Sequence, residues 1–174
     1  MEDKTRVAGG TGLSAEDISS GKIFLTEDSL DCAYAWDTGV AVNRYLAELK
    51  RGKIIATRCK KCKRIMLPPR LFCELCFIPC SDWQYVRDTG IINTFSICHV
   101  HWDASRIGKD EKPHLPAVIE IDGASPGMGI MHALGEIKPE EIKIGMKVKA
   151  VWKPEEERTG SITDIKYFKP VQEG

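Results

Sequence analysis

The sequence has no long apolar run and no excess of either charge. None of its apolar stretches approaches the roughly 20 residues that a membrane-spanning helix needs, so we expect no membrane span and no membrane partner. Lysines and arginines number 25 and acids number 25, so the net charge does not indicate a polyanionic partner. With 43% hydrophobic residues, the chain can nevertheless bury a core.

Common catalytic signatures are also missing. The chain shows no Ser–His–Asp order, no Gly-x-Ser-x-Gly motif and no Walker loop. It opens Met1-Glu-Asp-Lys4 without an apolar segment behind it, from which we expect no signal peptide. We therefore expect a reducing, cytoplasmic location, where free thiols persist as metal ligands.

The most specific pattern is formed by four of the seven cysteines. Cys59 and Cys62 form one C-x-x-C pair, and Cys73 and Cys76 form a second pair after ten intervening residues. Four thiolates suit one tetrahedral zinc ion, and a closed shell leaves no position for water, so we predict a structural zinc ribbon. Disulfides or unrelated buried thiols are the alternative, which the paired spacing disfavours. Cys80 could replace a ligand, but Cys76 completes a pair.

Before the ribbon, the sequence predicts an arm and a helix. Residues 1–36 are rich in Gly, Ser and Thr, without a sustained period, and indicate an extended arm that orders against a core or a partner, or else a frayed terminus. Residues 37–81 are predicted to form a helix plus the zinc ribbon. Asp37 or Thr38 can cap the helix, Gly52 can end it, and an apolar stripe follows the helical period at Val42, Tyr45, Leu46 and Leu49.

After the ribbon, residues 82–174 have the pattern of a small β-barrel. Apolar alternation and turn residues predict five or six strands and one helical turn at 139–142. The expected strands are 83–87, 91–98, 117–121, 128–134, 146–152 and 161–168. The predicted fold class is mainly β with an N-terminal helix: a rubredoxin-like zinc ribbon followed by a small Greek-key barrel of the OB type.

Two further groups of residues have alternative interpretations. His99 and His101 share one face of a strand and could form a polar site at a barrel rim, although histidines at a strand end without a chemical role are the favoured interpretation. Cys98 has a histidine neighbour in sequence, but adjacent strand residues point to opposite faces. We interpret Cys98 as a core thiol and Cys32 as part of the arm, not as nucleophiles.

Residues 50–70 carry nine basic side chains and no acid. This run fits a nucleic-acid-binding ribbon, a solvated face, or attraction to the phosphates of a coenzyme A thioester at a subunit interface. The barrel sequence does not show aromatic residues interleaved with basic ones, as base stacking needs. We therefore keep a zinc-ribbon/OB nucleic-acid-binding module only as the second hypothesis.

Taken together, these motifs resemble the DUF35 family of zinc-ribbon and OB-fold proteins associated with acyl-CoA enzymes. The resemblance covers about Tyr45 to Pro170, and its segments are Tyr45-Leu-Ala-Glu-Leu-Lys-Arg-Gly52, Arg58-Cys-Lys-Lys-Cys62, Leu67-Pro-Pro-Arg70, Phe72-Cys-Glu-Leu-Cys76, Asp88-Thr-Gly90, Pro116-Ala-Val-Ile-Glu-Ile121, Ile144-Gly-Met-Lys-Val148 and Phe168-Lys-Pro170. Many members have Gly after the second ribbon cysteine, where this chain has Lys63.

The resemblance implies a non-catalytic accessory subunit of a thiolase-type, acyltransferase complex. Cys59, Cys62, Cys73 and Cys76 match the family's zinc ligands, while the partner would supply the reactive cysteine. The chain would support the partner's active site and its channel for the coenzyme A thioester, and the arm would wrap the partner. Short ketoacyl and aryl-substituted succinyl thioesters are both compatible with this sequence. An independent enzyme using His99, His101 or Cys98 is the third hypothesis.

Overall fold

The computed structural model describes residues 14–21, 37–101, 105–108 and 110–171, in two units that span 1–36 and 37–174. In the first unit, α1 (Ala15–Ser19) is a helix of five residues, which the sequence analysis did not predict. Residues 22–36 of the predicted arm, which include Cys32, lie outside the described residues. No helix in the described part of the chain is long and apolar enough to cross a membrane.

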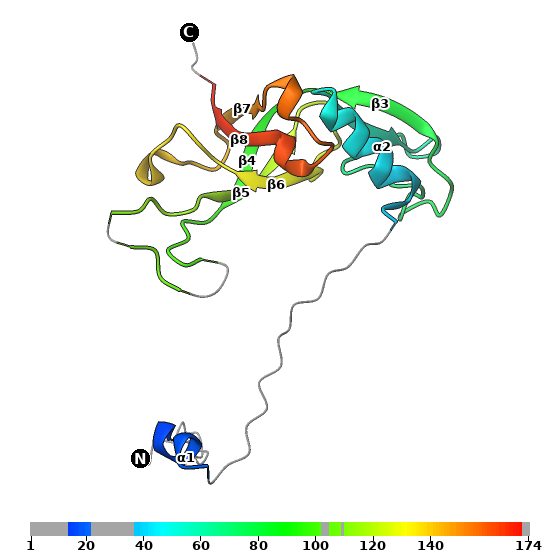
Figure 1. The fold of residues 1–174 in the computed structure, drawn as a ribbon. Helices are drawn as coiled ribbons and strands as arrows, with labels where there is room; N and C mark the ends of the chain where they lie inside the picture. Colours follow the sequence, from blue (N-terminus) through cyan, green and yellow to red (C-terminus); the bar gives the residue numbers. More distant parts are fainter. Residues whose placement is uncertain (1–13, 22–36, 102–104, 109, 172–174) are drawn as a thin grey trace, which may run out of the picture. The chain divides into compact units, whose positions relative to one another are not determined.

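The second unit contains one α-helix and two sheets (Figure 1). Its elements in chain order are α2 (Gly39–Lys50), β1 (Ile54–Arg58), β2 (Ile65–Met66), β3 (Asp82–Val86), β4 (Thr89–Phe95), β5 (Pro116–Ile121), β6 (Gly129–Ala133), η1 (Pro139–Glu141), β7 (Lys147–Trp152), η2 (Glu155–Glu157), η3 (Ile162–Asp164) and β8 (Ile165–Pro170).

Helix α2 lies where the sequence predicts it, but its buried face is rotated by about one residue. Val42, which the predicted stripe places in the core, is 41% exposed. The residues that are buried instead are Ala41, Tyr45, Glu48 and Leu49. Gly52 follows the helix with φ of 72°, a left-handed conformation that glycine adopts at little cost, and its N–H donates to the carbonyl of Leu49.

The buried carboxylate of Glu48 explains the rotation. It accepts a hydrogen bond from the hydroxyl of Tyr85 at 3.1 Å and pairs with Arg51 at 2.8 Å. A buried carboxylate is tolerated when such partners satisfy it. The periodicity of apolar residues alone does not reveal this, because Glu48 is counted as a surface residue.

The first sheet has the strand order β2-β1-β3 and forms the ribbon. Strand β3, which the sequence analysis groups with the barrel, pairs antiparallel with the whole of β1, from Ile54 opposite Val86 to Arg58 opposite Asp82. Arg87 and Asp88 form the short link from this sheet to the second sheet, which begins with β4.

The second sheet has the order β6-β5-β4-β7-β8 and closes into a barrel. Leu134 bridges Phe168 next to β6, and the N–H of Gly135 donates to the carbonyl of Phe168 at 2.9 Å. Strand β4 thus pairs with both β5 and β7, while β6 meets β8, which is the topology of an OB barrel. Fully buried side chains fill it, among them Ile92, Ile119, Val148, Ile165 and Phe168. The predicted fold class is confirmed.

The last predicted strand begins later than expected. Residues 162–164 form the 3-10 turn η3, and β8 starts only at Ile165. The cause is Asp164, which is fully buried and whose carboxylate accepts hydrogen bonds from three backbone N–H groups of the preceding turn, those of Thr159, Gly160 and Ser161. These bonds hold the backbone in a turn at positions where the apolar alternation predicts a strand.

Ribbon and barrel are in direct contact. The N–H of Ile65 in β2 donates to Oγ of Ser125 at 2.9 Å, and the N–H of Ser125 donates back to the carbonyl of Ile65 at 3.0 Å. The loop between β7 and β8 meets the turn that follows α2, because a Cβ added to Gly52 would lie 2.8 Å from Nη1 of Arg158. These contacts connect the ribbon with the barrel beyond the covalent turn.

Candidate metal centre

Two short turns bring together the four cysteines of the C-x-x-C pairs. Their sulfur atoms all lie within 4.8 Å of one another, and Sγ of Cys62 is 3.7 Å from Sγ of Cys73. Tetrahedral zinc with Zn–S bonds of about 2.3 Å separates its ligands by about 3.8 Å. The arrangement therefore fits one tetrahedral ion. Within the described residues, this cluster includes Cys76 and not Cys80.

The two turns, which we call knuckles, have the same backbone hydrogen bonds. In the first knuckle (59–63), the N–H of Lys63 donates to the carbonyl of Cys59 at 2.9 Å, and the N–H of Cys59 donates to the carbonyl of Arg64 at 2.9 Å. In the second knuckle (73–77), the N–H of Phe77 donates to the carbonyl of Cys73 at 2.9 Å, and the N–H of Cys73 donates to the carbonyl of Ile78 at 3.1 Å.

Each knuckle ends in a residue with a left-handed backbone. Lys63 has φ of 64° and Phe77 has φ of 53°. A non-glycine residue in this region costs roughly 1 kcal/mol relative to glycine. Lys63 thus adopts the left-handed conformation that a glycine at this position would permit, so the departure in sequence does not prevent the knuckle from forming.

Hydrogen bonding and burial act in opposite directions on the thiols. The backbone N–H of Cys62, helped by that of Lys61, lowers the pKa of Cys59 because it stabilises the thiolate. Burial raises the pKa of Cys80 to about 11 and that of Cys76 to about 12. Cys59 and Cys73 are buried, whereas Cys62 is exposed at the outer side of the cluster.

Comparisons with known proteins place this site in a family. The model described as "ChsH2, rubredoxin-like zinc ribbon domain" matches residues 46–79, and "ChsH2, C-terminal OB-fold domain" matches residues 83–153. A DUF35 domain-containing scaffold protein of Methanocaldococcus jannaschii is 30% identical over 127 residues, which are 71% of this chain and 85% of the relative. The chain belongs to the DUF35 family. The resemblance seen in the sequence is confirmed.

Other similar proteins are larger or more distant. A probable enoyl-CoA hydratase alpha subunit of Thermomonospora curvata is 28% identical over 116 residues. The match covers 64% of this DUF35 chain and 34% of the relative, so the chain spans about a third of that protein. A DUF35 protein of unknown function from Sulfolobus solfataricus has a TM-score of 0.56 at 21% identity, with 77% and 85% of the two chains covered. The Ltp2-ChsH2(DUF35) aldolase has a TM-score of 0.54 at 22% identity, with 79% and 98% covered. These two structures support the fold alone.

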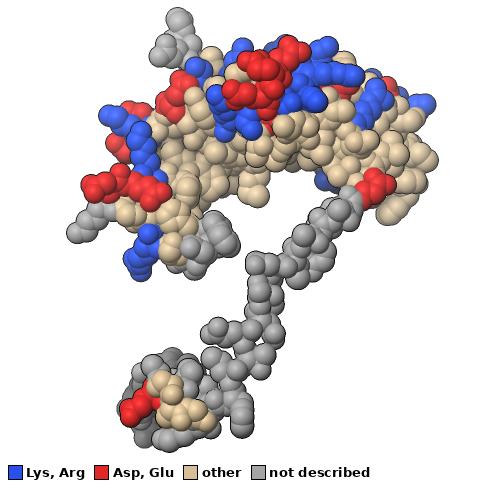
Figure 2. Space-filling model, viewed as in Figure 1, with Lys and Arg blue, Asp and Glu red and all other residues tan. Residues whose placement is uncertain are grey.

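The basic run of this DUF35 protein is partly neutralised by acids that flank it or face it. Arg51 pairs with Glu48, while Arg64 and Arg70 both pair with Glu74. Acidic and basic side chains also lie close together along the upper edge of the unit in Figure 2. The structure thus gives no specific support to the nucleic-acid hypothesis.

The histidine and cysteine candidates do not form a reactive pair. Nε2 of His101 lies 3.4 Å from Oε2 of Glu111, and its ring packs edge-on against that of His114, with centroids 5.6 Å apart. Sγ of Cys98 donates to the carbonyl of Val100, and no hydrogen bond between this thiol and an imidazole occurs in the described part of the chain. The His99 ring is exposed.

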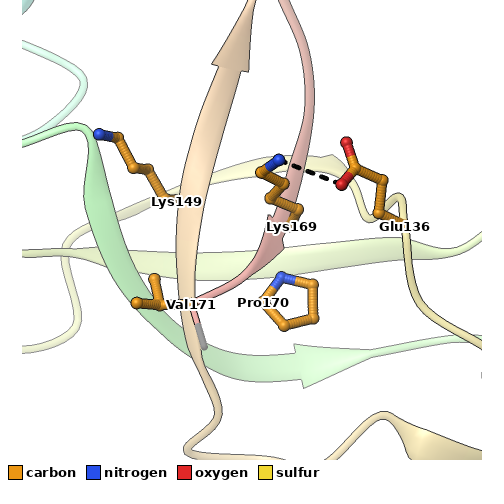
Figure 3. Close-up of a pocket in the computed structure, with 5 residues that line it drawn as sticks. All are labelled: Glu136, Lys149, Lys169, Pro170 and Val171. Atoms are coloured by element: carbon orange, nitrogen blue, oxygen red, sulfur yellow. Dashed lines mark hydrogen bonds and ion pairs between the residues drawn. The ribbon is translucent and has the colours of Figure 1, made fainter. Parts of the chain in front are cut away.

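A hollow of about 430 Å3 lies on the outer side of β7 and β8 (Figure 3). Lys149 and Lys169 face each other in the register of the two strands, but Lys169 turns to Glu136, which it contacts at 3.1 Å, and Lys149 points away. The hydroxyl of Tyr167 also donates to Glu136 and, with Lys169, lowers the pKa of its carboxyl group. Because Glu136 neutralises Lys169, the hollow offers an anion only the charge of Lys149.

The sequence analysis missed one surface. Phe72, Leu75 and Phe77, which surround the second cysteine pair, are 61%, 66% and 86% exposed. Apolar periodicity cannot identify them, since they belong to no helix or strand. A comparison of the two C-x-x-C turns with each other would have detected them, because the corresponding positions of the first turn are basic.

Proposed function

We propose that this chain is a non-catalytic, zinc-containing scaffold subunit of an enzyme complex that acts on acyl-CoA thioesters. The observation that supports it most is the match over 85% of a relative described as a DUF35 scaffold protein. The names of two further similar proteins, a probable enoyl-CoA hydratase subunit and an aldolase, are consistent with an acyl-CoA enzyme as the partner.

We assign a structural zinc ion to Cys59, Cys62, Cys73 and Cys76. The four sulfurs are close enough for a shared tetrahedral ion, and four thiolates leave no coordination position for substrate. The metal would hold the two knuckles together, because each knuckle supplies two of the four ligands. It would have no direct role in chemistry.

The partner that we propose is a thiolase-type subunit, as the family resemblance implies. That subunit would carry the reactive cysteine, while ribbon and barrel would support its active site and complete the channel for the coenzyme A thioester. Cys98, the cysteine of the third hypothesis, has no hydrogen bond to an imidazole among the described residues and so gives no support to an independent enzyme. A cytoplasmic location, where thiols stay reduced, belongs to this proposal.

Mild affinity purification of the full chain from its native cell tests the proposal. We expect one zinc per chain and stoichiometric co-elution of an acyl-CoA enzyme subunit with thiolase-type sequence. A hydratase or aldolase partner would keep the scaffold role and refute the thiolase assignment. A chain that elutes with RNA or DNA, and loses it steeply with added salt, would favour the nucleic-acid hypothesis. A chain without zinc would overturn the metal centre.

A further inference from the structure

The second knuckle presents apolar side chains to solvent. Phe72, Leu75 and Phe77, which we call the apolar tip, are all more than 60% exposed. Phe77 is the most exposed of them at 86%, and its backbone is held in the left-handed region that glycine prefers. An exposed phenylalanine in a strained conformation gains nothing from the isolated fold, so a role outside the chain is the physical explanation.

The first knuckle provides an internal control for this interpretation. Both turns have the same hydrogen bonds and the same left-handed end. At matching positions, Lys61 corresponds to Leu75, and Lys63 corresponds to Phe77. A zinc knuckle of this geometry therefore accepts charged side chains without difficulty. Folding and metal binding do not require the second knuckle to be apolar.

Positive charge lies on the knuckle next to the apolar tip. Lys60, Lys61 and Lys63 are exposed on the neighbouring knuckle, which is joined to the second by the contact between Cys62 and Cys73. The one acid of the second knuckle, Glu74, is neutralised by two arginines. The surface thus has an apolar tip beside exposed lysines, which we call the basic rim.

We propose that the apolar tip inserts into an apolar hollow rimmed by carboxylates on the acyl-CoA enzyme subunit. This inference rests on the proposed function and names the surface by which the partner is held. Charge favours such a partner over a second copy of this chain, because two tips in contact would bring their lysine rims together. Aromatic anchors in a desolvated pocket supply much of the affinity of protein interfaces.

The test is a double variant, Leu75→Lys with Phe77→Lys, which gives the second knuckle the side chains of the first. It is compared with wild-type full chain and with Ile144→Lys, which replaces an apolar side chain that is 69% exposed on the barrel. Affinity for the purified enzyme subunit is measured by titration calorimetry. We expect the double variant to bind at least a hundredfold more weakly, with zinc content and thermal stability unchanged. Ile144→Lys should bind as wild type does.

A second variant tests the rim. Lys61→Glu with Lys63→Glu should weaken binding at least tenfold at low salt, and the difference should shrink as salt is added. If wild type carries no acyl-CoA enzyme, the proposed function fails. If the enzyme binds wild type and the tip variant with equal affinity, only the tip assignment fails. Tip-dependent dimerisation of the chain alone, or tip-dependent binding to anionic phospholipid vesicles without affinity loss for the enzyme, would also overturn it.

Discussion

The buried hydroxyl of Tyr45 allows a stability change to be predicted with an unusual sign. Tyr45 is 4% exposed, and its hydroxyl has no hydrogen-bond partner. An unsatisfied buried polar group costs about 1–3 kcal/mol. Tyr45→Phe removes this group and keeps the ring, so we expect the free energy of unfolding to rise by about 1 kcal/mol. For a chain of this size, the melting temperature should rise by roughly 2–4 °C.

A second tyrosine near the same helix provides the control. The hydroxyl of Tyr85 donates to Glu48 at 3.1 Å, which is the bond that helps to satisfy the buried carboxylate. Tyr85→Phe makes the same chemical change but removes a hydrogen bond to a charged group, so the free energy of unfolding should fall. Urea unfolding of the zinc-loaded proteins at pH 7, followed by circular dichroism, measures both changes.

The sign decides the outcome. If Tyr45→Phe lowers the free energy of unfolding by about 1 kcal/mol, its hydroxyl has a partner and the reasoning is refuted. If both tyrosine variants are destabilised equally, the hydroxyl environments of the two residues do not differ in the way that the structure describes.

Three further outcomes follow from other parts of the fold. Lys63→Gly should stabilise the chain by roughly 0.5–1 kcal/mol, since it relieves the left-handed backbone, whereas Lys61→Gly should not; urea midpoints compare the two. Burial alone would raise the pKa of Asp164, but its three backbone donors outweigh burial and hold this pKa below 3.8. The stability that the Asp164 carboxylate contributes is therefore complete above about pH 4 and is lost as the pH falls through its folded-state pKa. Asp164→Asn should therefore lower the free energy of unfolding by about 2–3 kcal/mol at pH 7 and make it depend less on pH below about 4. An unchanged pH dependence in this range would contradict the assignment. Removal of zinc by a chelator should release one ion per chain and make the bonds after Lys60 and Lys61 sensitive to trypsin, and full protection of these bonds in the metal-free chain would argue against a metal-held ribbon.

Much of the fold can be predicted from the sequence because local patterns decide it. The C-x-x-C spacing brings the sulfurs together, and Gly52 lies at positive φ where the sequence places the end of a helix. Alternation of apolar residues locates most barrel strands. The fold class follows from the order of these elements.

The differences arise where a polar group is satisfied inside the protein. Glu48 is buried with two partners and shifts the face of α2, and Asp164 organises a turn where a strand is expected. Both effects depend on residues brought close by folding. The strand β3 alternates as a barrel strand would, and its register with β1 shows that it pairs in the first sheet.

The pair of hydrogen bonds between Ile65 and Ser125 has a mechanical consequence. Two reciprocal hydrogen bonds fix the short strand of the ribbon to a barrel turn 60 residues away in sequence. Together with the short link from β3 to β4, they leave the ribbon little freedom to pivot. A force applied at the knuckles is therefore transmitted to the barrel. A substitution that breaks these two hydrogen bonds would let the ribbon rotate relative to the barrel.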